Sequence, residues 1–344
     1  MKRKPTIQDV ADLAGVSKST VSKYLNNIPY VSAKTAEKIE KVIKEIGFQP
    51  NSLARSLVSN KTGLIGLAIS DFDNPINMEL IKSIQLEADK FNYQVVLIST
   101  NDDQRSEDQL PKLLGGKFQN LDGILLANAR EDGIEQTKLK KINEIFEHIV
   151  LVHRHVPTKD FDYVIIDGYM GAKLATEYLI RLGHKRIAMI SGPKKIFQFR
   201  ERVRGFQDTL QENGLLDQGL IIEVDEQKVE DGYRATEEIM FSGNNPTAIF
   251  ASTDRLALGV LDAAKNYGWE IPNELSVVGF DNIYFSRLAR VPLTTIDGRV
   301  KELGARSVQI LIEKIENIRK EREQIILSPT LVVRDSCSEV IKVK

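Results

Sequence analysis

The sequence is poor in the features on which several protein classes depend. Cys337 is its only cysteine, which excludes an intrachain disulfide and is typical of a reducing compartment. No run of about 18 apolar residues occurs, so we expect no membrane-spanning segment. The charged stretch Met1–Pro5 is not followed by an apolar segment. We therefore expect no signal peptide and a cytoplasmic protein.

Residue patterns typical of catalytic centres are also missing. No G-x-S-x-G, H-E-x-x-H or P-loop pattern occurs, and Cys337 lies in a C-terminal segment without a catalytic partner. We therefore predict that the protein is not an enzyme and needs no cofactor. His153 and His155 share one side of an extended segment, but no third ligand is in view. Zinc sites normally use three or four protein ligands, so we predict no metal site.

The charge is distributed unevenly along the 344 residues, although the whole chain carries only −1. Residues 1–61 contain eleven lysine and arginine residues against five acidic residues, a net charge of +6, which leaves −7 for residues 62–344. A basic head on an acidic body indicates a polyanionic partner for the head alone. The length predicts two or three domains.

Residues 6–47 predict three short helices. Thr6 and Asp9 have the spacing of a capping box at the start of the first helix. Ser17 begins the second helix after a tight glycine turn, and Ser32 begins the third, which carries an apolar stripe. This pattern favours a helix-turn-helix in a small bundle.

The second helix has two different faces. Val21 and Leu25 lie on its apolar side together with Thr20 and Tyr24. The opposite side is small, polar and basic, and it consists of Lys18, Ser19, Ser22, Lys23 and Asn26. Hydrogen-bond donors on such a face can reach base edges in the major groove. The alternative is an ordinary amphipathic helix.

The stretch from Thr6 to Asn26 resembles the opening of the LacI/GalR family of bacterial transcription regulators. The resemblance implies contacts with operator DNA from Thr6, Ser17, Lys18, Ser19, Thr20, Ser22, Lys23 and Asn26. Two positions depart from the family pattern. Lys23 stands where arginine is usual, and Tyr24 where a smaller residue is usual. Because lysine is a point donor, the base preference at Lys23 is open.

The segment after Pro50 is too short to fold as a helix alone. Its marginal helicity beside a basic head predicts folding on binding. The resemblance implies a hinge helix in the minor groove, in which Leu57 is wedged between base steps with Ala54 and Arg55 beside it. Packing of Leu57 on the body is the alternative.

From Thr62 onward, short apolar runs alternate with amphipathic segments. This alternation predicts an α/β fold with two doubly wound parallel sheets. The resemblance to the LacI/GalR family implies that these sheets form two subdomains like those of periplasmic binding proteins. Polar residues follow the apolar runs, where ligands bind in such sheets. Among them are Asp71, Asn74, Asn101, Asp102, Asn128, Arg154, Asp167, Thr253, Asp254, Asp281 and Asn282. Helix capping explains such residues as well.

The resemblance extends over the body to about Asp335, and it implies a small-molecule effector site there. The residues expected at this site are Phe72, Asn74, Ile76, Arg154, Asp167, Arg202, Thr253, Asp254 and Asp281. Phe72 would supply an apolar wall, and Ile76 replaces a usual aromatic residue. The chain is expected to cross between two subdomains three times, near 162–166, 290–293 and 327–330.

The expected domains are a helix-turn-helix domain over 1–50, a hinge over 51–61 and an effector-binding and dimerisation domain over 62–344. Within the last, the N-subdomain covers about 62–162 plus 293–327, and the C-subdomain about 163–292 plus 328–336.

We therefore predict a homodimeric repressor of carbohydrate-utilisation genes that binds a near-palindromic operator and is switched by a sugar or sugar acid. Arg154 and Arg202, with Lys194 and Lys195, could place positive charge at the pocket. Control by a protein corepressor or a nucleobase stays open. A sugar-binding transport protein would need a signal peptide and no basic head, and an enzyme would need a nucleophile and base.

Overall fold

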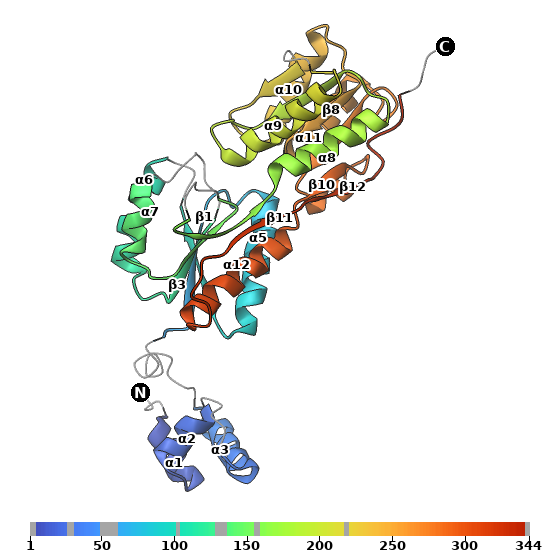
Figure 1. Cartoon of the computed structure of the whole chain (residues 1–344). Coiled ribbons are helices and arrows are strands. Elements are labelled where there is room, and N and C mark those ends of the chain that lie inside the picture. The colour runs from blue at the N-terminus through green and yellow to red at the C-terminus, as the bar shows by residue number, and fades with distance from the viewer. Residues whose placement is uncertain are drawn as a thin grey trace. The chain divides into compact units, whose positions relative to one another are not determined.

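The structure is a computed structural model, and it describes residues 5–25, 31–48, 61–100, 104–127, 136–154, 159–216 and 220–340 (Figure 1). Its internal contacts divide the chain into two units, Met1–Gly63 and Leu64–Lys344. The predictions for Asn26, and for Ala54, Arg55 and Leu57 of the hinge, lie outside the described residues. Within the described ranges, no helix combines the length and apolar character needed to cross a bilayer.

The first unit contains the three predicted helices. They are α1 (Ile7–Ala14), α2 (Lys18–Leu25) and α3 (Ala33–Ile46). The predicted capping box is confirmed, because the Thr6 hydroxyl accepts from the Asp9 N–H while the Asp9 carboxylate accepts from the Thr6 N–H at 2.7 Å. Ser32 caps α3, and α1 and α3 each end at a glycine in the left-handed conformation. Local capping therefore sets the boundaries of these helices.

A small apolar core holds the three helices together. It is formed by Val10, Ala11, Ala14, Val21, Ile39, Val42 and Phe48. Val21 of α2 is fully buried in it, and Tyr24 and Leu25 pack against it. The predicted apolar side of α2 is therefore the side that packs, which leaves the polar side outward.

The second unit contains two sheets. In the first, all six strands are parallel. In spatial order they are β11 (Gln324–Leu327), β5 (Asp162–Ile166), β4 (Ile149–Val152), β3 (Gly123–Ala127), β1 (Leu64–Ile69) and β2 (Gln94–Ser99). Helices α5 (Pro75–Lys90) and α12 (Val300–Ile315) cover one face, and α6 (Gln104–Lys117) and α7 (Gln136–Asn143) cover the other (Figure 1). We call this sheet and its four helices the first subdomain.

The second sheet is also covered by helices on both faces, and we call this sheet and its helices the second subdomain. Its order is β12 (Thr330–Val332), β10 (Thr294–Asp297), β9 (Ser276–Phe280), β8 (Ala248–Ala251), β6 (Ile187–Ser191) and β7 (Ile221–Glu223). Helices α8 (Gly168–Arg181) and α9 (Phe197–Glu212) pack on one face, and α10 (Val229–Phe241) and α11 (Asp254–Tyr267) on the other. A 3-10 helix, η2 (Tyr284–Arg287), follows β9. The predicted parallel α/β fold is confirmed, with β12 as an antiparallel edge strand.

The chain crosses between these two subdomains after β5, after β10 and between β11 and β12. The first two crossings were predicted about one strand too early. β5 pairs with β4 in the first sheet, and β10 pairs with β9 in the second, so each strand belongs to the subdomain before its crossing. One buried apolar cluster includes side chains of both subdomains, such as Val164 and Phe280.

Two glycines allow α10 and α11 to approach each other closely. A Cβ atom at Gly232 would collide with the Leu256 carbonyl, and a Cβ atom at Gly259 would collide with the Val229 carbonyl. Both obstacles are backbone atoms, which cannot rotate away as side chains can. Close packing of this helix pair therefore depends on the absence of side chains here.

We predict that Gly259→Ala lowers the free energy of unfolding by about 1–3 kcal/mol, because the helices must separate to admit the methyl group. Urea denaturation measures the change. Gly116→Ala is the matched control, since Gly116 lies in α6 and a methyl group there would meet no atom within 4 Å. There, the better helix propensity of alanine should stabilise by up to about 1 kcal/mol. Equal effects from both substitutions would contradict the packing argument.

Candidate ligand cleft and DNA-reading helix

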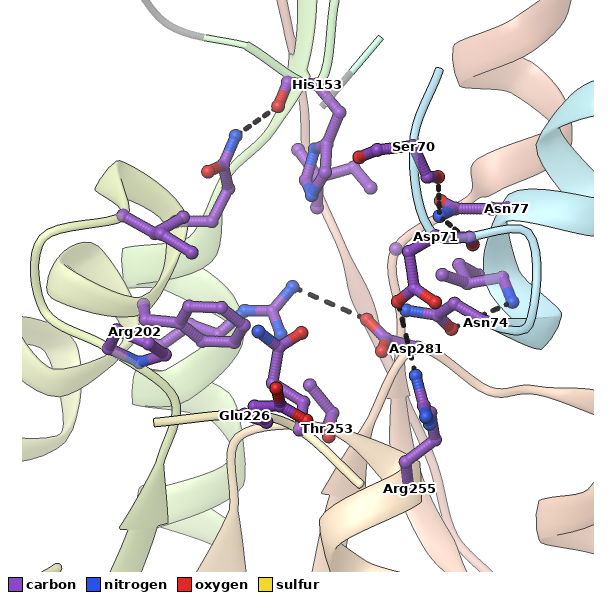
Figure 2. A pocket seen from close by; sticks show the side chains of 18 of the residues that line it. Ser70, Asp71, Asn74, Asn77, His153, Arg202, Glu226, Thr253, Arg255 and Asp281 are labelled. Atoms are coloured by element: carbon purple, nitrogen blue, oxygen red, sulfur yellow. Dashed lines mark hydrogen bonds and ion pairs between the residues drawn. The ribbon is translucent and has the colours of Figure 1, made fainter. Parts of the chain in front are cut away.

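A cavity of about 550 Å³ lies between the carboxyl ends of the two sheets. The first subdomain contributes residues from the β1–α5 loop and from the end of β4, and the second contributes residues of α9 and of the loops after β7, β8 and β9. Figure 2 shows polar side chains from both sides facing this space. The volume and mixed lining are typical of a small-molecule site.

Five of the residues predicted for the effector site line the cavity. They are Asn74, Ile76, Arg202, Thr253 and Asp281. Asn74 and Thr253 also cap helices: the Asn74 side chain accepts from the Ile76 N–H, and the Thr253 hydroxyl accepts from the Leu256 N–H at 3.2 Å. Capping and cavity lining are therefore compatible at these two positions.

The other four predicted residues are not part of the cavity wall. Asp167 caps α8 by accepting from the Met170 N–H at 2.9 Å. Arg154 is buried, with 4% of its surface exposed, and Phe72 is partly exposed, but neither lines the cavity. Asp254 is fully buried behind the wall. Position after a strand did not distinguish wall residues from caps and core residues.

Arg202 is a buried cation at the cavity wall, with 3% of its side chain exposed. It donates to the Ser252 carbonyl and lies 3.4 Å from Asp281 Oδ1. Its guanidinium also stacks 3.5 Å from the centroid of the Phe280 ring. Burial lowers the pKa of Arg202, while the Asp281 carboxylate opposes that effect. The guanidinium of Arg202 thus places a positive charge at the wall, and its Nε has no hydrogen-bond partner among the described residues.

Two carboxyl groups, Asp281 of the wall and Asp254 behind the wall, lie near Arg202. Burial raises the pKa of Asp281 to about 6, although Arg202 and Arg255 oppose this. Burial, and then the charge of Asp281, raise the pKa of Asp254 to about 8. Asp254 accepts from Thr295 Oγ1 at 2.5 Å and from the Ile283 N–H at 2.9 Å. Asp254 therefore holds the β9–η2 loop that carries Asp281.

His153 is a wall residue in the left-handed backbone region, with φ of 53°. Burial, together with the charge of Arg202, lowers its pKa to about 3, so the imidazole is neutral at physiological pH. Its carbonyl accepts from Gln198 Nε2, while its buried Nδ1 has no hydrogen-bond partner among the described residues. This nitrogen is available for a ligand hydroxyl.

The polar side of α2 is open to solvent. Lys18, Ser19 and Lys23 are exposed, whereas Thr20 and Ser22 are half-buried. The Ser17 hydroxyl accepts from the Thr20 N–H at 3.1 Å and so caps the helix. The outward side chains are the hydrogen-bonding and basic ones, which is the arrangement that reading of a major groove needs.

Comparison with known proteins agrees with the two regions described above, the helical region with α2 and the α/β region with the cavity. Residues 6–51 match the family described as bacterial regulatory proteins, lacI family, and residues 176–337 match the periplasmic binding protein-like domain. The transcriptional regulator DegA of Bacillus subtilis is 35% identical over 97% of this chain and 98% of its own length. The chain belongs to the LacI family of DNA-binding transcriptional regulators.

Other members of the LacI family align over almost the whole chain. The repressor PurR of Histophilus somni is 33% identical over 96% of this chain and 98% of its own length. A lac repressor dimer bound to operator and an anti-inducer has a TM-score of 0.83 at 27% identity, covering 98% of this chain and all of its own. The regulator CelR in complex with cellobiose has a TM-score of 0.73 at 27% identity, covering 97% and 100%.

This LacI-family chain has wall residues that the sequence analysis did not assign to the effector site. They are Ser70, Asp71, Asn77, His153, Gln198, Phe199 and Arg255, among others. Asp71 is one of the polar residues that follow an apolar run, whereas the sequence points to His153 only as a candidate metal ligand. His153 directly follows the apolar run of β4, so the rule that selected Arg154 could have selected it. No such signal marked Gln198, which lies inside a helix.

We predict that Asp254→Asn flattens the pH dependence of stability. The pKa of Asp254 is raised above its unfolded value of 3.8, so the stabilisation it provides is complete below that value and is lost as the pH rises through about 8. Between pH 5 and 8, the wild-type chain should lose up to about 1.4 kcal/mol per pH unit relative to the variant.

Urea denaturation at a series of pH values measures this difference. Asp262→Asn is the control, because Asp262 is an exposed carboxyl group on the same helix. Parallel stability profiles for wild type and Asp254→Asn would show that Asp254 is ionised in the folded chain throughout this range.

Proposed function

We propose that the chain is a homodimeric repressor of carbohydrate-utilisation genes, which binds a near-palindromic operator and is switched by a sugar. Residues 1–50 would form the DNA-binding domain, 51–61 the hinge, and 62–344 the effector-binding and dimerisation domain. The strongest support is the polar cavity between the two subdomains of a LacI-family chain. Among the similar structures, the lac repressor is bound to operator and CelR is in complex with cellobiose.

The charge pairing of the wall favours an uncharged sugar over a sugar acid. Three wall cations each contact a wall carboxylate. They are Arg202 with Asp281 at 3.4 Å, Arg255 with Asp71 at 3.2 Å, and Lys228 with Glu226 at 2.5 Å. Lys195 is a fourth wall cation and Asp225 a fourth wall carboxyl group, so the described wall carries equal numbers of both and has little net positive charge for an anionic ligand. Amide, carboxylate and imidazole groups remain to exchange hydrogen bonds with sugar hydroxyls.

A nucleobase is the second candidate, because PurR proteins are among the relatives. Purine sites commonly stack the base on aromatic rings. Among the described wall residues, Phe199 is the one phenyl or indole side chain, and its ring lies 5.5 Å from the Arg202 guanidinium. Ile76 also offers an aliphatic surface rather than a ring. The wall therefore favours a hydroxyl-rich ligand over a planar one.

The full-length chain should bind DNA from upstream of its own operon with sequence specificity. Fluorescence anisotropy with that DNA and a scrambled duplex of equal length measures this, with and without sugars. A sugar that raises the thermal unfolding temperature should also change the operator affinity, because the two binding events are linked. Equal affinity for both duplexes would overturn the regulator proposal. If only purines stabilised the chain, the proposal that its ligand is a sugar would be overturned.

On the DNA side, Lys23→Ala should relax the preference at particular base pairs, because its exposed ammonium group can donate to base edges. Ser17→Ala should weaken binding to all DNA sequences alike, because a contact with phosphate does not depend on the base sequence. Lys41→Ala is the matched control, since Lys41 is an exposed lysine of α3 that pairs with Glu45 on the helix surface. A uniform loss of affinity from Lys23→Ala would contradict base reading.

In the hinge, Leu57→Ala should weaken operator binding far more than non-specific binding.

On the ligand side, His153→Leu should weaken sugar binding by about tenfold or more, because it removes a buried acceptor and leaves a ligand hydroxyl unpaired. His153→Asn is the conservative variant, since asparagine tolerates the left-handed backbone and retains an acceptor. Calorimetric titration with the sugar found by thermal shift gives both affinities. An unchanged affinity in His153→Leu would show that His153 does not contribute to sugar binding.

A further inference from the structure

Two polar contacts join the subdomains directly at the cavity. Arg255 Nη1 of α11 lies 3.2 Å from Asp71 Oδ2, which follows β1 of the other subdomain. Gln198 Nε2 of α9 donates to the carbonyl of His153, which follows β4. Figure 2 shows the side chains of Asp71 and Arg255 pointing toward each other, joined by a dashed line. Any movement that separates the subdomains must break both contacts.

The loop that carries Asp71 is firmly held. Asp71 adopts a left-handed φ of 51°, and its carbonyl accepts from the Asn74 N–H at 3.2 Å and from Asn77 Nδ2 at 2.9 Å. Asn77 also donates to the Ser70 carbonyl at 3.0 Å. The buried amide of Asn77 thus fixes the backbone from which the Asp71 carboxylate reaches Arg255.

Arg255 lies within electrostatic reach of a second carboxylate in its own subdomain. Its positive charge lowers the pKa of Asp281, against the larger effect of burial. Only 17% of the Arg255 side chain is exposed, so a guanidinium left without any carboxylate here would be costly. Asp281 lines the same cavity as Arg255 and also pairs with Arg202, so it is the carboxylate that Arg255 can share when the subdomains separate. Arg255 therefore has a carboxylate within electrostatic reach in both arrangements.

We propose that Arg255 is a positioning residue that sets how far the cleft is closed, by pairing with Asp71 when the subdomains meet and with Asp281 when they part. The inference rests on the proposed function for its role in regulation, since a sugar between the subdomains would act on the same closure. Two compensated arrangements of one side chain make the cleft a two-state element, which a ligand can bias in either direction.

The test measures the separation of the subdomains by single-molecule energy transfer. Dyes are attached to Lys112→Cys on α6 and Glu238→Cys on α10, both exposed positions, in a Cys337→Ser background. An excess of unlabelled chain ensures that each labelled chain reports on itself alone. Neither DNA nor sugar is required, so failure of the proposed function would leave this readout intact.

Asp71→Asn and Arg255→Gln should each shift the population toward the larger separation, lowering the ratio of closed to open molecules by roughly fivefold, as expected for one partly exposed ion pair. The double variant should be no more open than either single one, and Arg255→Lys should restore part of the closed population. Raising the salt concentration should open the wild type and leave Asp71→Asn unchanged.

Arg234→Gln is the matched control. It removes an exposed arginine of the same subdomain that lies 2.7 Å from Asp231 of the same helix, so its ion pair does not join the two subdomains. The proposal is overturned if the separation is unchanged in Asp71→Asn and Arg255→Gln, or if Arg234→Gln changes it equally. Additive effects in the double variant would likewise show that Asp71 and Arg255 act independently.

Discussion

The cleft depends on one topological constraint, which is that the chain passes three times between two parallel sheets. Parallel strands all end at the same edge, so the crossings bring the carboxyl ends of both sheets to one space. The crossings also limit relative movement to a few short segments, while one apolar cluster joins the two subdomains beside them. The polar wall is thus assembled from loops and helices that the two sheets position.

Electrostatic compensation is the second constraint on the wall. Arg202 is buried against aromatic rings, and the carboxylate of Asp281 beside it compensates its charge. Asp281 in turn depends on a loop that Asp254 holds from behind. Arg255 connects this group to Asp71 in the other subdomain. The ion pairs of the wall, the contact between the subdomains and the raised pKa values of Asp254 and Asp281 therefore depend on the same few side chains.

Helix boundaries in the head could be predicted from the sequence because they are determined locally, as at Thr6 and Ser32. The sheets could be predicted from continuous apolar runs, although the edge strands β7 and β11 carry short runs of three apolar residues and are partly exposed, so they were not among the predicted strands. The wall was harder to predict. Asp167 and Asn74 follow strands in the same way, yet only Asn74 lines the cavity. That difference, like the approach of Arg255 to Asp71, arises from the packing of one subdomain on the other.

Three wall residues, Asp71, His153 and Asp281, have positive φ angles although none is glycine. Most side chains are strained in that region, and short polar ones tolerate it best. Divergence toward new ligands is therefore restricted at these three sites by the backbone itself. Positions in ordinary helical conformation, such as Ile76 and Phe199, are free of that restriction. New specificities should accumulate along the helices while the loop positions vary within a narrow set of residue types.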